Sequence, residues 1–400
     1  MRALIVRLGQ VSVGLLEQLE EWEYRFSFDP LWLRAQERGV LGQLFEDRKP
    51  HDIATTGHVP IWFSHLLPQG PLRRAVARQL AIDVEDEFDL LEFLGGDLPG
   101  AVVMVPGQPR LSQHPLPRPR SAPALAEKLK FSLAGAQWKL SVRPGERGLT
   151  MPVRKGETGS WIAKFHDPTF KDLPRVEFAT MRWAHLAGVA IPAFRQAQVS
   201  EFEELPEGIP TGDGTVFLIE RFDRGAEGQR IHIEDLAQVL DRPPGEPQYG
   251  GRYEHIAAVL SYAAPDDLRA FCERLVFCVL CGNTDAHLKN WSLIYPDGRT
   301  PRLSPAYDLI SSVLYAPEFI SDELALSLNH SRRFEDVDVG SFRLLAEISR
   351  IPFDEVASWV RQATERVRTI WQKEAVHLPW TDVERQRLER HLARVPLASP

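Results

Sequence analysis

The chain has 400 residues, of which 44% are hydrophobic and 26% are charged, and these fractions exclude a disordered chain, a collagen-like chain and a coiled-coil rod. Lys and Arg number 47 and Asp and Glu number 55, giving a formal net charge of −8 that argues against broad, charge-driven DNA binding, although a local basic patch stays open. At roughly 150 residues per domain, the length predicts two or three compact units.

The cysteines and the N-terminus indicate the compartment. Cys272, Cys278 and Cys281 are odd in number and lack the spacing of a disulfide framework, which predicts a reducing cytoplasm. Cys278 and Cys281 could form half of a metal site, but no second Cys or His pair stands at zinc-finger spacing, and a buried structural role is the simpler interpretation. Residues 1–7 are expected to form a strand and not a signal peptide, and no apolar run approaches the roughly 20 residues of a membrane span.

Residues 1–105 are expected to form a small mixed domain. Residues 2–8 have the pattern of a strand, and 71–81 that of a helix with Pro71 in its first turn. The segment 83–97 holds seven acids and no base around an apolar stripe. This composition predicts an amphipathic helix whose acidic face is solvated.

A proline-rich segment, 106–125, is expected to connect this domain to the rest of the chain. Six prolines stand between residues 106 and 123. Proline fixes φ and lacks an N–H, so neither a helix nor an inner strand can form there. Arginines and lysines stand in and after the segment, and both a solvated linker and a contact with a partner or phosphate remain open.

Residues 126–233 are expected to hold strands and turns around one helix, 175–188, which ends at Gly188. The expected strands are 139–142, 149–153, 161–165 and 215–220. The last of these is almost continuously apolar, which predicts burial on both faces. Residues 234–400 are expected to be largely helical, with one hairpin at 291–303. A β-rich half followed by a helical half is the plan of a two-lobed kinase.

Two patterns in the β-rich half could carry chemistry. The turn 131–139 contains Ala134 and Gly135, whose small side chains would let backbone N–H groups approach phosphate oxygens; a plain hairpin turn is the simpler alternative. Lys164 stands in mid-strand between apolar neighbours. It would contact ATP phosphates with Glu177 of the next helix as its pairing acid, or else extend to the surface.

Two further patterns lie in the helical half. Asp285 and Asn290 have the D-x-x-x-x-N spacing of kinase catalytic loops, in which the carboxylate accepts the substrate hydroxyl proton and the amide oxygen ligates Mg²⁺. Asp308 follows the hairpin, which would return it beside Asn290 as a second Mg²⁺ ligand. Taken singly, each of these residues could instead be a cap or turn residue. The order of all four patterns along the chain favours a two-lobed kinase.

At these residues the chain resembles the HipA family of serine/threonine kinases, the toxin half of bacterial toxin–antitoxin pairs. The stretches that carry the resemblance are 132–139, 220–224, 232–238, 282–290 and 307–311, with 62–70 and 87–91 in the N-terminal domain. The resemblance implies an α+β, bilobal protein-kinase-like fold. A small α/β N-terminal subdomain (1–105) and the linker (106–125) would precede a β-rich N-lobe (126–233) and a helical C-lobe (234–400).

The resemblance also implies roles for single residues. Ser132 is similar to the serine that these kinases autophosphorylate, and Glu220 and Phe222 are similar to the hinge whose backbone holds adenine. Ala134 and Gly135 belong to the loop that covers the nucleotide. The remaining implied roles are catalytic aspartate for Asp285, phosphate contact for Lys164, Mg²⁺ ligation for Asn290 and Asp308, and support for Glu177, His287 and Lys289.

The function implied is that of a cytoplasmic, ATP-Mg²⁺-dependent serine/threonine protein kinase. Family members act on aminoacyl-tRNA synthetases, pair with a HipB-like helix-turn-helix antitoxin, and reach DNA only through it. A small-molecule phosphotransferase would share the Asp, Asn and Asp, but would not account for the N-terminal domain or Ser132. A degenerate kinase that serves as a co-repressor partner would have no need to keep Lys164, Asp285, Asn290 and Asp308.

Overall fold

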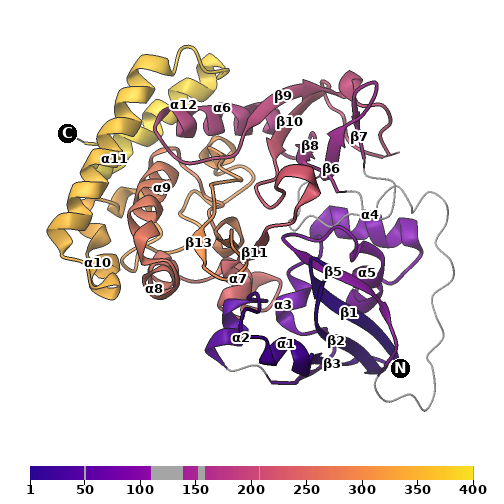
Figure 1. Cartoon of the computed structure of the whole chain (residues 1–400). Helices are drawn as coiled ribbons and strands as arrows, with labels where there is room; N and C mark the ends of the chain where they lie inside the picture. The colour runs from indigo at the N-terminus through magenta and orange to yellow at the C-terminus, as the bar shows by residue number, and fades with distance from the viewer. Residues whose placement is uncertain (49–50, 110–137, 152–157, 207, 400) are drawn as a thin grey trace.

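The structure is a computed structural model and describes residues 1–48, 51–109, 138–151, 158–206 and 208–399. In these residues the strands form three sheets, with strand orders β4-β3-β2-β1-β5, β7-β6-β8-β10-β9 and β11-β12-β13. Figure 1 shows the first sheet in an N-terminal body at the lower right and the second sheet above it. The helices α8 to α12 lie to the left of the second and third sheets.

The N-terminal body is an antiparallel sheet with helices packed on it. Its strands are β1 (Arg2–Leu8), β2 (Val11–Glu20), β3 (Glu23–Phe28), β4 (Ile53–Thr56) and β5 (Val102–Gly107). Its helices are α1 (Pro30–Arg34), α2 (Gln43–Asp47), α3 (Ile61–Ser64), α4 (Gly70–Leu80) and α5 (Glu87–Leu94). The strand expected at 2–8 and the helix expected at 71–81 are confirmed as β1 and α4. Pro106 lies near the end of the edge strand β5, where a missing N–H is tolerated.

The solvated acidic face expected for 83–97 is confirmed at Asp83 and Glu85, which are exposed, and is wrong at three other acids. Glu87, Asp89 and Asp97 are all buried. Arg2 of β1 pairs with Asp89 and Glu92, and Arg73 of α4 pairs with Glu87. The bases that neutralise these acids come from other elements, so local composition gave no sign of them.

The second sheet forms the N-lobe. Its strands are β6 (Lys139–Pro144), β7 (Leu149–Thr150), β8 (Trp161–Lys164), β9 (Phe194–Gln198) and β10 (Thr215–Glu220), and its helix is α6 (Leu173–Leu186). The expected strands begin where the structure has them, and β9 is an addition. Strand β10 is buried on both faces as expected, because Phe217 and Ile219 pack in the cluster that contains α6, and Val216 and Leu218 pack in the cluster of β6 and β8.

Within the described residues, the C-lobe contains six α-helices. They are α7 (Leu236–Val239), α8 (Tyr253–Ala263), α9 (Leu268–Leu280), α10 (Arg343–Ser349), α11 (Phe353–Glu374) and α12 (Asp382–Arg394). The third sheet consists of β11 (His232–Asp235), β12 (Ser292–Tyr295) and β13 (Arg302–Leu303), so the hairpin expected at 291–303 is confirmed. The expected lobe boundary at 233/234 falls inside β11, which pairs with β12. The three cysteines are free and buried in and after α9, as the structural interpretation predicts.

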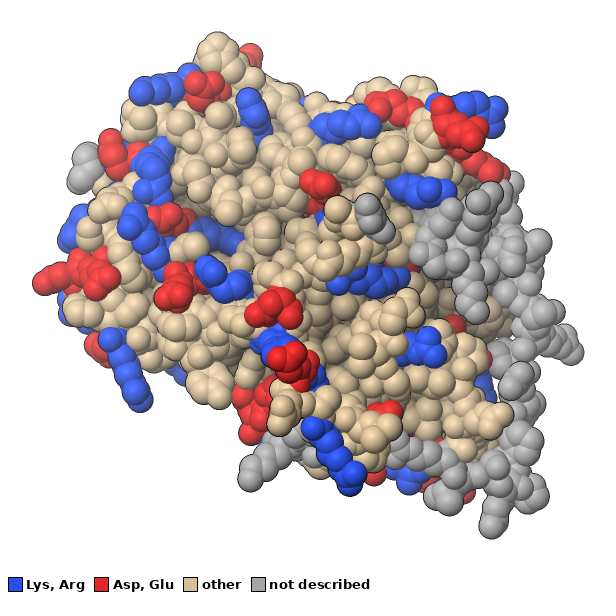
Figure 2. All heavy atoms as spheres, viewed as in Figure 1, with Lys and Arg blue, Asp and Glu red and all other residues tan. Residues whose placement is uncertain are grey.

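Two observations bear on contact with a membrane or with a highly charged partner. In the described parts of the chain, no helix is both long and apolar enough to cross a bilayer. On the face shown in Figure 2, basic and acidic side chains are interspersed. Such interspersion limits the reach of any single-sign field on this face.

A buried ion network joins the N-terminal body to the N-lobe. Asp97 accepts hydrogen bonds from Arg221 Nη1 at 3.1 Å and Arg224 Nη2 at 2.7 Å. Asp223 accepts from the same two guanidinium groups, at 2.8 Å each. Because Arg221 and Asp223 directly flank Phe222, the network fixes the segment after β10 against the N-terminal body.

We predict that Asp97→Ala destabilises the protein by about 3–5 kcal/mol, because it leaves two buried guanidinium groups short of a counter-charge. The control is Glu323→Ala, which removes an ion pair with Arg332 that is nearly half exposed and should change stability by about 1 kcal/mol or less. Thermal and urea unfolding of the full chain measure both. Equal losses of stability in the two variants would contradict the role of this network in fixing the N-terminal body to the N-lobe.

Candidate active site

A cavity of about 650 Å³ lies where the second sheet, the C-lobe and the N-terminal body meet. All nine predicted site residues that the structure describes line it: Lys164, Glu177, Glu220, Phe222, Asp285, His287, Lys289, Asn290 and Asp308. Ser132, Ala134 and Gly135 lie outside the described residues. Residues up to 144 positions apart in sequence, Lys164 and Asp308, therefore share one cleft, which is the arrangement that a nucleotide site requires.

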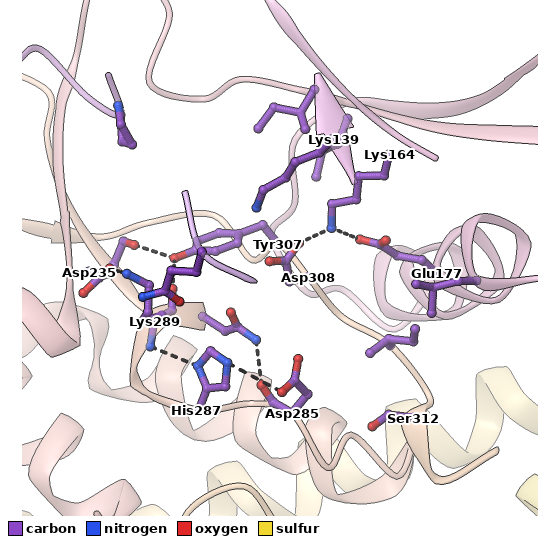
Figure 3. A pocket seen from close by; sticks show the side chains of 18 of the residues that line it. Lys139, Lys164, Glu177, Asp235, Asp285, His287, Lys289, Tyr307, Asp308 and Ser312 are labelled. Carbon is purple, nitrogen blue, oxygen red and sulfur yellow. Dashed lines mark hydrogen bonds and ion pairs between the residues drawn. The ribbon is translucent and has the colours of Figure 1, made fainter. Parts of the chain in front are cut away.

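Lys164 is held between two carboxylates. It ends strand β8, is 3% exposed, and donates to Glu177 of α6 and to Asp308 (Figure 3). Burial disfavours its charge, but Asp308 and Glu177 outweigh burial, so the pKa of Lys164 is raised. The alternative in which this lysine extends to the surface is therefore excluded by its contacts.

The two carboxylates differ in protonation. Burial opposes ionisation of Asp308, but Lys164 and Lys139 outweigh it and lower the pKa of Asp308 to about 2. Burial is the larger effect at Glu177 and raises its pKa to about 7 in spite of Lys164. Asp308 is thus ionised at neutral pH, whereas the pKa of Glu177 lies close to neutral pH.

Asp285 stands in a loop that hydrogen bonds fix from within. Its backbone N–H donates to Asn283 Oδ1 at 2.8 Å, and its carbonyl accepts from Asn290 Nδ2 at 2.6 Å. His287 Nε2 lies 3.5 Å from Asp285 Oδ1, and His287 caps the following 3-10 turn, η6 (Leu288–Asn290). The carboxylate of Asp285 caps no element in this loop, so it is available to contact a ligand in the cleft.

The carboxylate of Asp285 faces the open part of the cleft. Its side chain is 62% exposed, and partial desolvation by the protein around the cleft, together with the charge of Asp308, raises its pKa, while His287 acts in the opposite direction. A raised pKa brings a carboxylate closer to the range in which it can accept a proton usefully.

Asp308 reaches the cleft through the hairpin β12–β13. It has a φ of +52°, in the left-handed region that a residue with a side chain seldom adopts. Strained backbone of this kind persists where its surroundings hold it, and here Lys164 holds the carboxylate. Its neighbour Tyr307 donates to the carbonyl of Lys289 at 2.8 Å, so the hairpin is also fixed to the loop of Asp285.

The segment after β10 supplies an aromatic surface to the cleft. Glu220 ends the strand and is exposed, and the ring of Phe222 stacks on that of Tyr307 at 5.6 Å between centroids. Both rings line the cavity. A planar base could lie against such a surface.

Sequence reasoning gave no role to several residues that line this cleft, among them His65, Lys139, Asp235 and Tyr307. Lys289 pairs with Asp235 at 3.0 Å and contacts His65 Nδ1 at 3.0 Å. All four stand inside the stretches that carry the family resemblance, but nothing local to His65 indicates that the N-terminal body reaches the catalytic loop.

The residues present fit a magnesium ion. Among the described residues, no group of three or more His, Cys, Asp or Glu side chains stands ready to hold a metal. Mg²⁺ in phosphoryl-transfer sites instead takes one or two protein oxygens together with phosphates and water. Asn290 uses its amide nitrogen on Asp285, which leaves its oxygen for a ligand, and Asp308 is ionised.

Two family models match this chain and together span most of it. The model of the HipA N-terminal domain matches residues 4–105, and that of the HipA-like C-terminal domain matches residues 131–373. The chain belongs to the HipA family. The predicted membership is therefore confirmed.

Relatives of this HipA-family chain are named as kinases. It is 35% identical over 406 residues to "Putative kinase Y4dM" of Sinorhizobium fredii, with 98% of this chain and 97% of the relative covered. It is 26% identical over 330 residues to "Serine/threonine-protein kinase toxin HipA" of Shewanella oneidensis, with 73% and 71% covered.

A solved structure shows the same fold. The Shewanella oneidensis toxin–antitoxin complex of HipA, HipB and operator DNA matches with a TM-score of 0.73 at 20% identity, covering 99% of this chain and 96% of that chain. The predicted α+β, two-lobed kinase-like fold of this HipA-family protein is confirmed.

We predict that Lys164→Met destabilises the protein increasingly as the pH rises from about 7 to 8. The variant leaves Glu177 buried without its cation, which raises further a pKa that is already about 7 in the wild type against an ordinary 4.5. Above pH 7 the folded variant keeps a proton that both the unfolded chain and the folded wild type have released, so its stability falls with pH faster than that of the wild type. The stabilisation from the lowered pKa of Asp308 is absent from the variant across the whole range.

Thermal unfolding of the wild type and the variant at several pH values measures the effect. Lys373→Met on the exposed face of α11 removes one charge at a distance from the cleft and serves as the control. A deficit in Tm that stays constant between pH 5 and pH 8 would contradict the pairing with Glu177.

Proposed function

We propose that this protein is an ATP- and Mg²⁺-dependent serine/threonine protein kinase and the toxin of a HipBA-like toxin–antitoxin module. The observation that carries the proposal is the convergence of Lys164, Asp285, Asn290 and Asp308 on one cavity. Phosphoryl transfer depends mostly on positioning and on charge stabilisation, and these side chains supply both.

The reaction assigns one task to each group. The substrate hydroxyl attacks the terminal phosphorus of ATP, the bond to the ADP oxygen breaks, and the hydroxyl proton passes to Asp285. His287 stays beside Asp285 and orients it, and Lys164 faces the phosphates. Bound Mg²⁺, held by Asn290 and Asp308, would offset phosphate charge.

The remaining predicted roles extend this proposal. The backbone at Glu220 and Phe222 would hold adenine, with the base against the rings of Phe222 and Tyr307. Ala134 and Gly135 would cover the phosphates. Ser132 would be the site of autophosphorylation, and the charge added there would oppose nucleotide phosphates and lower activity. The protein substrate would be an aminoacyl-tRNA synthetase.

We predict that Asp285→Asn lowers phosphoryl transfer by roughly 10²- to 10⁴-fold, the usual contribution of a general base. Purified full-length protein is incubated with radiolabelled ATP and Mg²⁺, with and without candidate synthetases, and phosphopeptides are located by mass spectrometry. The expected label on the chain itself lies at Ser132 and is lost in the variant. Asp382→Asn, on the exposed start of α12, should leave the label unchanged.

The other outcomes separate the competing functions. Label on an aminoglycoside-like small molecule, and on no protein, would favour a small-molecule phosphotransferase. Absence of transfer to any acceptor by the wild type would favour a catalytically weak co-repressor. Label that persists in Asp285→Asn would overturn the role given to this residue.

The partner proposed is a HipB-like helix-turn-helix antitoxin in the cytoplasm, and DNA would be reached only through it. The solved relative was observed with HipB and operator DNA, which supports this partner. We expect the tagged chain, expressed with its neighbouring reading frames, to co-purify with a small helix-turn-helix protein and to retard operator DNA in gels only when that protein is present. Retardation by the chain alone would contradict the indirect contact.

A further inference from the structure

His65 of the N-terminal body contacts the C-lobe through both nitrogens of its ring. It directly follows α3 and is 1% exposed. Its Nε2 lies 2.6 Å from the carbonyl oxygen of Arg242, which can only accept a hydrogen bond, so Nε2 carries the ring proton. Nδ1 is therefore an acceptor, and it lies 3.0 Å from Lys289 Nζ. Burial and the charge of Lys289 both lower the pKa of His65, which favours this neutral ring.

The ammonium of Lys289 is used within the protein, although the residue lines the cavity. It pairs with Asp235 Oδ2 at 3.0 Å, contacts His65 Nδ1 at 3.0 Å and donates to the carbonyl of His65 at 3.3 Å. An ammonium has three protons, and these three acceptors match them. Two of the three belong to His65, so the N-terminal body determines where this side chain of the catalytic loop lies.

The main chain of Lys289 holds side chains on both sides of the reaction centre. Its N–H donates to His287 Nδ1 at 3.2 Å, and its carbonyl accepts from the hydroxyl of Tyr307 at 2.8 Å. Because His287 Nδ1 accepts, its Nε2 carries the proton, and this nitrogen lies 3.5 Å from Asp285 Oδ1 (Figure 3). A shift of Lys289 would therefore turn His287 relative to Asp285 and move Tyr307 next to Asp308.

We propose that His65 is a positioning residue for phosphoryl transfer, which acts through Lys289 to orient His287 and Asp285. This inference rests on the proposed kinase function. His65 gives up no proton in the reaction, because its N–H remains on the carbonyl of Arg242. Its contribution is geometric, and a misplacement of about 1 Å at a reacting group can cost roughly 100-fold in rate.

Two substitutions separate the two contacts of the ring. In His65→Asn the amide oxygen can take the place of Nδ1 and accept from Lys289, whereas in His65→Gln the amide nitrogen can take the place of Nε2 and donate to Arg242. We expect His65→Gln to lower kcat by roughly 10- to 100-fold and to leave the Kd for ATP within about threefold. His65→Asn should keep kcat within about threefold of the wild type. The control, His58→Gln, changes an exposed histidine of the same body and should behave as the wild type.

The measurements use the full-length chain with Mg²⁺. The rate of transfer from saturating radiolabelled ATP to the acceptor that the wild type labels gives kcat, calorimetry with ATP gives Kd, and thermal unfolding gives Tm. Each variant of His65 gives up one hydrogen bond of the ring, so the two should show similar falls in Tm.

The outcomes distinguish a positioning role from a structural one. A kcat for His65→Asn as low as that of His65→Gln, or losses of kcat that follow Tm, would overturn the inference. Unchanged kcat in His65→Gln would also overturn it while leaving the kinase function standing. Absence of transfer to any acceptor by the wild type would overturn the function itself, and the inference with it.

Discussion

The ammonium of Lys164 is the point at which the two lobes are fixed to each other. It comes from β8 of the N-lobe, one of its partners comes from α6, and the other comes from the chain that follows the β12–β13 hairpin. Burial of a charge is unfavourable unless partners compensate the loss of water, so the ion pairs of Lys164 favour the one arrangement in which these three elements meet. That arrangement also sets where Asn290 and Asp285 stand, because Tyr307, next to Asp308, is hydrogen-bonded to the same loop.

The N-terminal body lines part of this cleft and contacts the elements that form the rest of it. His65 contacts Lys289 of the catalytic loop. Glu234 of β11 accepts from Trp62 Nε1 at 3.0 Å and from the backbone of Gln43 at 2.8 Å, both in the N-terminal body. With the network around Asp97, these contacts reach the catalytic loop, the third sheet and the segment after β10. Separating the two family domains would therefore expose buried polar groups on both.

The sequence was informative where a pattern is local. Strand alternation, the apolar run of β10 and the hairpin that returns Asp308 follow from neighbouring residues, and so does the spacing of Asp285 and Asn290. The failures depend on distant partners. The acids of α5 were expected in solvent because Arg2 and Arg73 lie on other elements, and His65 carries no motif that indicates its contact with Lys289. Strand β9 is largely polar and pairs with β10 at the edge of the sheet. Its own residues lack the alternation of apolar and polar side chains that predicts a strand.

The two buried charge clusters of the protein differ in one respect, and the difference bears on function. At the junction around Asp97, each buried arginine and each buried aspartate has an opposite charge within reach. In the cleft, by contrast, no acidic side chain of the described residues contacts Lys139, the pKa of Glu177 is raised, and Asp308 has a left-handed φ. Each of these features is unfavourable for the free protein. The junction has none of these features, which indicates that the side chains of the cleft, unlike those of the junction, are not arranged for stability alone.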